Sequence, residues 1–225
     1  MADLVPPLAE RLHAVITDDQ SITDLRRYFG IGLPPGGPLF TGRRFEYLAG
    51  GGDLPEVADV VTAADLIAVQ TLSVTVPADA ALRLLEGTPG KQLSDLLRAV
   101  PTHVDMAYAD AADLAPGSPA DRAWHLLRDL PGVGRVTAGK LLARKRPRLL
   151  PVYDRVVRCA VGRPESFWLA LHSALRADDH ALHRELMTLR QAAGLPETVS
   201  VLRTCDVAVW MRHRTDHQEM GCVWQ

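Results

Sequence analysis

One short segment, residues 130–154, constrains the local fold more than any other. It reads LPGVGRVTAGKLLARKRPRLLPVYD: a glycine turn, a basic stretch with helical spacing, and a proline-bounded turn that ends on Asp154. Glycine permits a sharp backbone turn and leaves no side chain beside it. A helix that follows such a turn begins with amide hydrogens that lack intrahelical partners. The segment therefore predicts two helices joined by a tight turn, with an aspartate at the start of a third helix.

Most of the remaining chain is also predicted to be helical. Ser118-Pro119-Ala120-Asp121 combines a capping serine, a proline at the first helical position and an acid near the positive helix end. Thr62-x-x-Asp65 is similar to a capping box. Further helices are expected over residues 135–145, 154–161, 165–176, 180–193 and 198–212, whereas strand-like stretches are few and isolated. The predicted fold class is all-α.

Length and composition suggest the domain organisation. The 225 residues, 47% hydrophobic and 23% charged, can bury a sizeable core. They suit a single compact helical unit over residues 1–225, built as a two-lobed fold with a cleft between the lobes. The glycine- and proline-rich residues 28–61 are expected to form an irregular N-terminal loop, and residues 214–225 a tail. The glycine turn and Asp154 fall within segment 118–163.

The charge of the chain is strongly uneven. Nine basic residues and one acid, Asp154, lie between Gly132 and Arg163, which makes this window +8. The whole chain is −2, so the remaining 193 residues sum to −10. Such polarity indicates local attraction of a polyanion. The alternative is a solvated helix face that happens to carry many arginines.

The glycine turn is a candidate phosphate site. Its glycines and the amides that open the next helix could hold a phosphate by backbone alone. Val133 is expected to insert into the core, and Thr137, Ala138, Leu141 and Leu142 to form the buried face of the helix. The candidate DNA-binding residues are Gly132, Val133, Gly134, Arg135, Lys140, Arg144 and Lys145. The alternative is that the turn merely links two helices.

The motif LPGVGRVTAGKLL resembles the hairpin of the helix-hairpin-helix DNA glycosylase superfamily. In that superfamily a catalytic aspartate follows the hairpin glycines by about twenty residues, and here Asp154 follows Gly132 by 22 positions. The resemblance covers roughly residues 118–163. The chain as a whole is similar to a family of actinobacterial proteins, a resemblance that implies no activity.

The resemblance implies a partner, double-stranded DNA, and a reaction. Members with lyase activity carry a lysine two residues after the second hairpin glycine, where this chain has Val136. Valine is no nucleophile, so the implied enzyme is monofunctional and leaves an abasic site. The resemblance also implies that hairpin carbonyls could hold a monovalent cation. The three widely spaced cysteines exclude the four-cysteine iron–sulfur cluster of some members.

Asp154 is the candidate catalytic residue. Cleavage of an N-glycosidic bond builds positive charge on the sugar, which a carboxylate can stabilise. The target base must first leave the stack, and Tyr153 could stack against it. The alternative is that Asp154 only caps the helix that follows.

Several other functions are not expected. No apolar run is long enough to cross a membrane, and no secretion signal is evident. Cys159, Cys205 and Cys222 fit a reduced, cytoplasmic protein better than a disulfide framework. His213, His217 and Cys222 have spacing that can bind zinc, but solvent-facing histidines are favoured, and no metal is expected. A monomer is expected.

Three functions are therefore considered. The first is a monofunctional DNA glycosylase that acts on a damaged or modified base. The second is a non-catalytic DNA-binding or lesion-sensing protein with the same fold. The third is an enzyme that acts on another nucleic-acid or nucleotide substrate.

Overall fold

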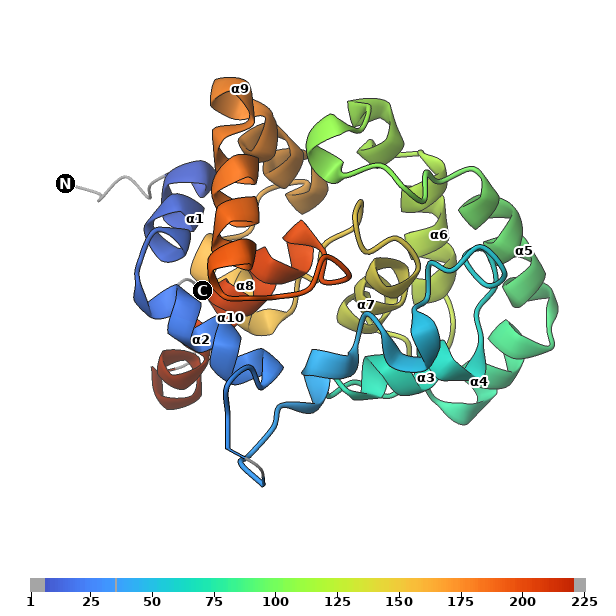
Figure 1. Cartoon of the computed structure of the whole chain (residues 1–225). Helices are drawn as coiled ribbons and strands as arrows, with labels where there is room; N and C mark the ends of the chain where they lie inside the picture. The colour runs from blue at the N-terminus through green and yellow to red at the C-terminus, as the bar shows by residue number, and fades with distance from the viewer. Residues whose placement is uncertain (1–6, 35, 221–225) are drawn as a thin grey trace. The chain divides into compact units, whose positions relative to one another are not determined.

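The computed structural model describes residues 7–34 and 36–220, and every regular element in them is a helix. The predicted all-α class is confirmed. The chain divides into two compact units (Figure 1): unit 1 comprises residues 1–39 and 153–225, and unit 2 residues 40–152. The boundary at residues 152 and 153 falls inside segment 118–163, so the glycine turn belongs to unit 2 and Asp154 to unit 1.

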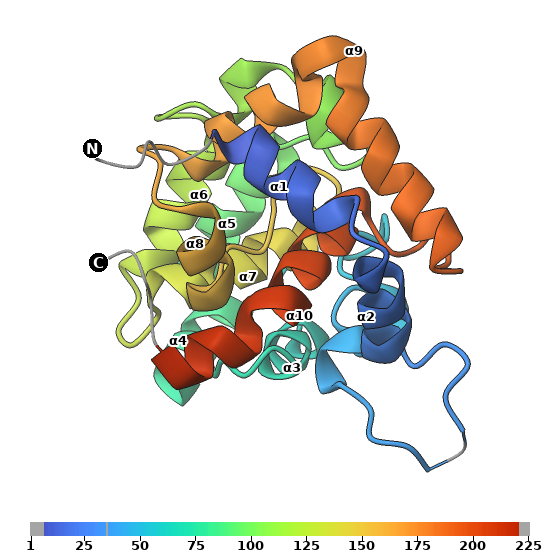
Figure 2. The same cartoon turned by 90° about the vertical axis from the view of Figure 1, so that its left-hand side faces the viewer.

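Unit 1 is built around its last helix. Its helices are α1 (Leu8–Ile16), α2 (Gln20–Phe29), α8 (Arg155–Val161), α9 (Phe167–Ala192) and α10 (Val201–Met220). Helix α10 packs against all four of the others, and α1 also packs against α9 (Figure 2). The middle of α10 is buried accordingly, with Val207 and Ala208 at 1% and 0% exposure.

Two helix boundaries in unit 1 test the sequence predictions. Helix α9 is interrupted from Ala177 to His180, where the backbone leaves helical geometry, so the predicted separation into 165–176 and 180–193 is confirmed. The predicted start of the tail at residue 214 is wrong, because α10 continues to Met220. Arg214 lies over the Trp210 ring, at 5.2 Å from its centroid, and this contact one turn apart supports the extension. Residues 221–225 lie outside the described residues.

Unit 2 contains the remaining helices. Its α-helices are α3 (Ala63–Gln70), α4 (Ala78–Leu85), α5 (Thr88–Arg98), α6 (Pro119–Arg128) and α7 (Arg135–Lys145). Short 3-10 turns are η1 (Thr41–Arg44), η2 (Leu48–Gly50), η3 (Met106–Tyr108) and η4 (Ala111–Leu114). Helix α7 packs against α3 and α6, and α5 packs against α4 and α6. Apart from the end of α2 and the turns η1 and η2, residues 28–61 are irregular in the described part, as expected.

Local sequence signals explain where two of these helices begin. Thr62 and Asp65 form a complete capping box at α3, each side chain bonding the other's backbone amide. The Ser118 hydroxyl accepts a hydrogen bond from the Asp121 amide at the start of α6. Both predicted helix starts are confirmed. Capping by such side chains stabilises a helix by about 1 kcal/mol.

Asp65 also joins α3 to α7 through a buried ion cluster. Its carboxylate accepts from Arg144 Nε at 3.1 Å and from Lys145 Nζ at 2.9 Å, and these three residues are at most 1% exposed. Burial lowers the pKa of Lys145, and the charge of Asp65 opposes this shift. A buried charge without a partner is very costly, so the cluster fixes α7 against α3.

The Arg144 guanidinium also organises the irregular segment before α3. It donates to the carbonyl oxygens of Phe45, Glu46 and Leu48. A Cβ atom on Gly52 would lie only 2.4 Å from the Arg144 carbonyl oxygen, so the chain can pass this close only at glycine. One side chain of α7 thus satisfies three backbone carbonyls of this irregular segment.

Arg146 and Lys140 also donate hydrogen bonds to backbone carbonyls in other parts of unit 2. Arg146 donates to the carbonyls of Val100 and Ala58 and pairs with Asp59 at 2.6 Å. Burial lowers the pKa of Arg146, and Asp59 opposes the shift. Lys140 Nζ donates to the Leu72 carbonyl at 2.8 Å. The side chains of Lys140, Arg144, Lys145 and Arg146 therefore stabilise unit 2 from within.

The cysteines differ from the reduced state that was expected. Cys159 is disulfide-bonded, so that expectation is wrong for this residue. Cys205 is free and buried in α10. Burial raises the pKa of its thiol to about 12. In the described part of the chain, no helix combines the length and the apolar character that crossing a membrane requires.

Replacing Arg144 with methionine is expected to destabilise the protein by about 3–5 kcal/mol, because it strands buried carbonyls and part of the Asp65 charge. Arg83→Met is the matched control, since its pair with Asp79 is more than half exposed on both sides, and should cost less than about 1 kcal/mol. Urea unfolding of the full chain, followed by circular dichroism, measures both. Equal losses in the two variants would contradict the role of Arg144.

Cys205 is expected to resist alkylation in the native protein. With a pKa of about 12, only about one thiol in 10⁴ is ionised at pH 8, and the thiolate is the reactive form. Iodoacetamide should therefore modify Cys205 only after denaturation, as measured by mass spectrometry of its peptide. Rapid alkylation under native conditions would show that the thiol is not enclosed by the core.

Candidate functional site

The glycine turn joins two packed helices. Helix α6 ends at Arg128 and α7 begins at Arg135, and the two helices contact each other in unit 2 (Figure 1). The Val133 amide donates to the Leu130 carbonyl at 3.0 Å, and Gly132 has φ +76°, a left-handed conformation that favours glycine. Val133 is only 5% exposed, which confirms that it inserts into the core.

The helix after the turn buries the predicted face. Its predicted core residues, Thr137, Ala138, Leu141 and Leu142, are all buried. The surface of the turn is different: Gly132, Gly134 and Arg135 are exposed. Gly134 is the N-cap of α7 and supplies no side-chain cap. Within the described residues, no heavy atom outside the local backbone and the two chain neighbours lies within 4 Å of the position that a Cβ on Gly134 would take, so there is open space at the start of α7.

Neighbouring side chains hold this turn in place. Trp124 Nε1 donates to the Arg135 carbonyl at 3.3 Å, and Arg128 lies over the Trp124 ring at 4.6 Å from its centroid. Gly132 packs against Pro77, which precedes α4, so closely that a Cβ would lie 2.6 Å from Pro77 Cγ. The amides at the start of α7 are therefore presented by a supported turn, a geometry that suits an anion.

The prediction that Lys140, Arg144 and Lys145 face DNA is wrong. These side chains are 4%, 1% and 0% exposed and are engaged by carbonyls and by Asp65 within unit 2. Helical spacing placed Lys140 and Arg144 on one face of α7, but the partners that cover this face come from residues 45–72. Of the predicted basic contacts, only Arg135 is exposed.

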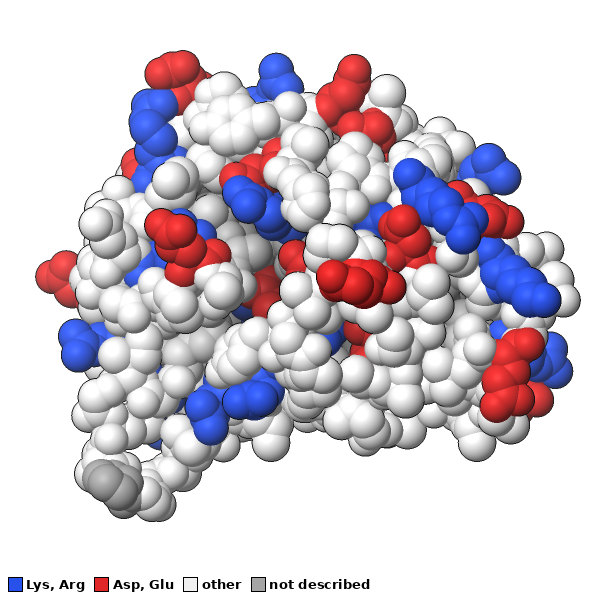
Figure 3. All heavy atoms as spheres, turned by 45° about the vertical axis from the view of Figure 1, so that its right-hand side comes forward, with Lys and Arg blue, Asp and Glu red and all other residues white. Residues whose placement is uncertain are grey.

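The surface charge is accordingly less polarised than the sequence suggests. Of the nine basic residues in the +8 window, Lys140, Arg144, Lys145 and Arg146 are buried. On the face drawn in Figure 3, basic and acidic side chains are interspersed and form no continuous basic patch. Any phosphate at the turn would be held mainly by backbone amides.

Asp154 lies at the start of α8, as predicted. Its Oδ1 accepts a hydrogen bond from the Val157 amide at 3.1 Å, so it is the N-cap of that helix. The capping role suggested by the sequence is therefore confirmed, and the catalytic role stays a prediction. The side chain is half-buried, whereas Arg155 beside it is exposed.

A buried polar cluster near Asp154 was missed by sequence reasoning. Arg203 Nη1 donates to Asp206 Oδ2 at 2.7 Å, and Arg203 Nη2 donates to the Tyr28 hydroxyl. Burial is the main cause that raises the pKa of Tyr28, and the charges of Asp206 and Asp154 raise it further. Asp154 thus lies within electrostatic range of this cluster. An Arg–Asp pair three residues apart among apolar residues of α10 is the one signal that could have revealed it.

Tyr153 is less free than the stacking hypothesis assumes. Its ring stacks on Phe167 with centroids 3.8 Å apart and planes 10° from parallel, and its hydroxyl donates to the Gly162 carbonyl. One ring face is therefore already covered. The role of Tyr153 in base stacking stays a prediction, and it now concerns the other face alone.

No group of three or more His, Cys, Asp or Glu side chains in residues 7–34 and 36–219 is arranged to hold a metal ion. The zinc ligands suggested by sequence spacing are His213, His217 and Cys222, and Cys222 lies outside the described residues. Burial lowers the pKa of His213.

The two turn glycines are expected to respond differently to alanine. Gly132→Ala should cost about 1–3 kcal/mol, because a positive φ is unfavourable for alanine and its Cβ would meet Pro77. Gly134→Ala should cost less than about 1 kcal/mol, because its φ is −80° and the surrounding space is open. Thermal unfolding of both variants compares them. A larger loss at Gly134 would contradict the turn geometry.

Comparison with known proteins identifies one matching family. No curated protein and no solved structure matches this chain. A family model described as a family of unknown function, DUF6308, matches residues 21–213, which include the glycine turn, Asp154 and the Arg203 cluster. Because the match spans most of the 225 residues, the chain belongs to the DUF6308 family.

Proposed function

We propose that the protein is a monofunctional DNA glycosylase that removes a damaged or modified base from double-stranded DNA. The observation that carries the proposal is the open start of α7, where exposed Gly132 and Gly134 present uncapped backbone amides. Neutral amides at a helix N-terminus bind phosphate without side chains. The resemblance of residues 118–163 to the glycosylase hairpin supports the same conclusion.

In this proposal the turn binds the strand and Asp154 acts on the extruded nucleoside. One oxygen of Asp154 holds the cap of α8, which fixes the orientation of the carboxylate. The carboxylate would stabilise the positive charge that develops on the sugar as the base leaves with the electrons of the N-glycosidic bond. Water would then add to the sugar and give up a proton to the departed base. No lysine occupies the position of Val136, so the proposed product is an abasic site and an intact strand.

Other parts of the proposal follow from the same resemblance. A monovalent cation at the turn would be held by backbone carbonyls, and no step of the proposed reaction depends on it. Action on cellular DNA implies a cytoplasmic location.

A second candidate is a DNA-binding protein without catalysis. The observation in its favour is that Asp154 has a complete structural role as the cap of α8. A residue that caps a helix has a structural role that needs no catalytic explanation. Under this alternative the turn still binds DNA, but no base is released.

The test is a cleavage assay on duplexes that each carry uracil, an alkylated base, an oxidised base or a hypermodified base. We expect strand breaks with one of these duplexes, and only after alkali treatment. Asp154→Asn should lower the rate about 10²- to 10³-fold while leaving circular dichroism unchanged, because asparagine caps a helix about as well as aspartate. Asp110→Asn is the matched control, since Asp110 caps η4 in the same way.

The binding arm of the test separates the two candidates. Gly134→Leu fills the open space at the start of α7 and should weaken binding of every duplex about tenfold, as measured by fluorescence anisotropy. Tight binding by the wild-type chain without any break supports the non-catalytic candidate. If Gly134→Leu binds DNA as well as wild type, both candidates fail.

A further inference from the structure

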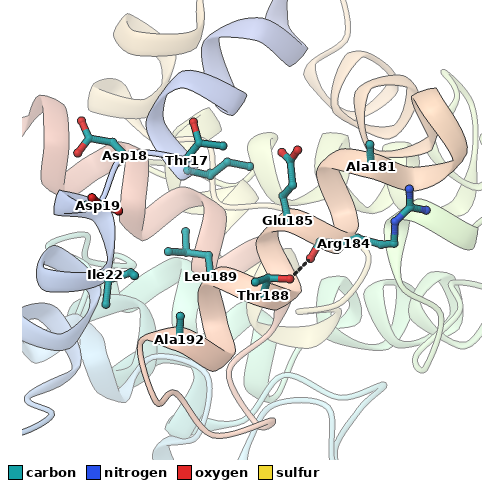
Figure 4. Close-up of a pocket in the computed structure, with 11 residues that line it drawn as sticks. Thr17, Asp18, Asp19, Ile22, Ala181, Arg184, Glu185, Thr188, Leu189 and Ala192 are labelled. Atoms are coloured by element: carbon teal, nitrogen blue, oxygen red, sulfur yellow. Dashed lines mark hydrogen bonds between the residues drawn. The ribbon is translucent and has the colours of Figure 1, made fainter.

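A separate pocket lies within unit 1. It occupies about 440 Å³ where the turn between α1 and α2 faces the end of α9 (Figure 4). Small-molecule sites in proteins usually fall between about 300 and 1,000 Å³. None of the residues that line this pocket belongs to the proposed DNA site, so the pocket is a separate feature of the molecule.

The floor of the pocket is apolar. Ile16 and Leu189 form its base and are each only 5% exposed, and Ile22, Ala181 and Ala192 lie at its sides. Figure 4 shows Leu189 and Ala192 on α9 facing Ile22 on α2. A ligand that enters this space can bury hydrocarbon against the floor, at about 25 cal/mol per Å² of apolar surface removed from water.

The hydroxyl groups at the pocket present acceptors. Thr17 Oγ1 donates its hydrogen to the His13 carbonyl at 2.7 Å, and Thr188 Oγ1 donates to the Arg184 carbonyl at 3.0 Å (Figure 4). A hydroxyl has one hydrogen and two acceptor lone pairs. With their hydrogens committed, both threonines offer only acceptors to a ligand.

The charged groups at the pocket favour a cation. Its lining contains three carboxylates, Asp18, Asp19 and Glu185, and one guanidinium, Arg184. Arg184 is turned away in Figure 4 and pairs with Asp179 at 3.0 Å.

Not all three carboxylates are equally available. The Asp18 carboxylate accepts from the Gln20 amide at 2.8 Å and pairs with Arg212, so both of its oxygens already have partners. Glu185 contacts His13 through Oε2 at 2.9 Å. The Asp19 carboxylate forms no hydrogen bond or ion pair with any residue of the described ranges 7–34 and 36–220. Asp19 and Glu185 are therefore the groups that would meet a cation.

The C-terminal ends of two helices also favour a positively charged ligand in the pocket. Helix α1 ends at Ile16 and α9 ends at Ala192, so two helix C-termini, which carry partial negative charge, border the pocket. The positive end of α2 is also near, but the Gln20 amide at this end already donates to Asp18. The field in the pocket thus favours positive charge.

We propose that this pocket binds an aliphatic primary amine, with the hydrocarbon chain on the floor of Ile16 and Leu189 and the ammonium group between Asp19 and Glu185. The apolar floor, the acceptor-only hydroxyls and the excess of carboxylates all match such a molecule. A carboxylate or phosphate ligand in the same place would be repelled by Asp19 and Glu185, and the Arg184 guanidinium is already paired with Asp179. The inference does not depend on the proposed DNA function.

The test is titration of the full-length protein with n-hexylammonium, followed by amide shifts in two-dimensional NMR. We expect saturable binding with a dissociation constant of about 1 mM or tighter and shifts that concentrate in residues 16–22 and 181–192. Hexanoate has the same chain with the opposite charge and should produce no saturable shifts there. Ethylammonium has the charge without the chain and should bind at least about tenfold more weakly.

Variants locate the site. Glu185→Gln and Asp19→Asn should each weaken binding about two- to fivefold, as expected for partly exposed charges, and the double variant should weaken it further. Ala192→Phe fills the pocket from an exposed position and should abolish binding. Glu10→Gln, an exposed acid on α1 outside the pocket, is the matched control and should bind as wild type does.

Each outcome decides the proposal. Localised hexylammonium shifts that Ala192→Phe removes support it. Equal binding of hexanoate, shifts spread over the whole surface, or undiminished affinity in Ala192→Phe would overturn it. Salt is an additional check, because affinity should fall between 0.05 M and 1 M NaCl if carboxylates hold the ammonium.

Discussion

The buried contact between Asp65, Arg144 and Lys145 is the constraint on which unit 2 depends. A cation removed from water must find both a counter-charge and hydrogen-bond acceptors. Asp65 supplies the charge, and the carbonyls of residues 45–48 supply the acceptors. The irregular segment before α3 is ordered because Arg144 satisfies its backbone. Gly52 follows from the same need, since a Cβ there would lie 2.4 Å from the Arg144 carbonyl oxygen.

This constraint changes how the basic segment should be understood. Positive charge near a glycine turn suggests a surface that binds phosphate. Four of these basic residues, in α7 or directly after it, are instead buried: Lys140, Arg144, Lys145 and Arg146. What is left at the surface is the turn itself, with its amides and Arg135. A site built mainly from backbone depends on the exact path of the chain, which Val133, Trp124 and Pro77 maintain.

Unit 1 has a different character. Its polar residues form a buried cluster around Arg203 and Tyr28, with Asp154 close enough to influence the pKa of Tyr28. On another part of the same unit, carboxylates gather at the ends of α1 and α9 above an apolar floor. One arrangement is enclosed and the other is open, so only the second is accessible to a small ligand without rearrangement.

The sequence alone determined the features that depend on neighbouring residues: the all-α class, the caps at Thr62, Ser118 and Asp154, the break near residue 178 and the burial of Val133. These follow from backbone geometry and from hydrogen bonds within a few positions. Only the tertiary structure decided that Arg144 and Lys145 are buried, because their partner Asp65 lies about 80 positions away in the sequence. A helical repeat shows which residues share a face, but a charged face is buried or exposed according to the acceptors that distant segments bring to it.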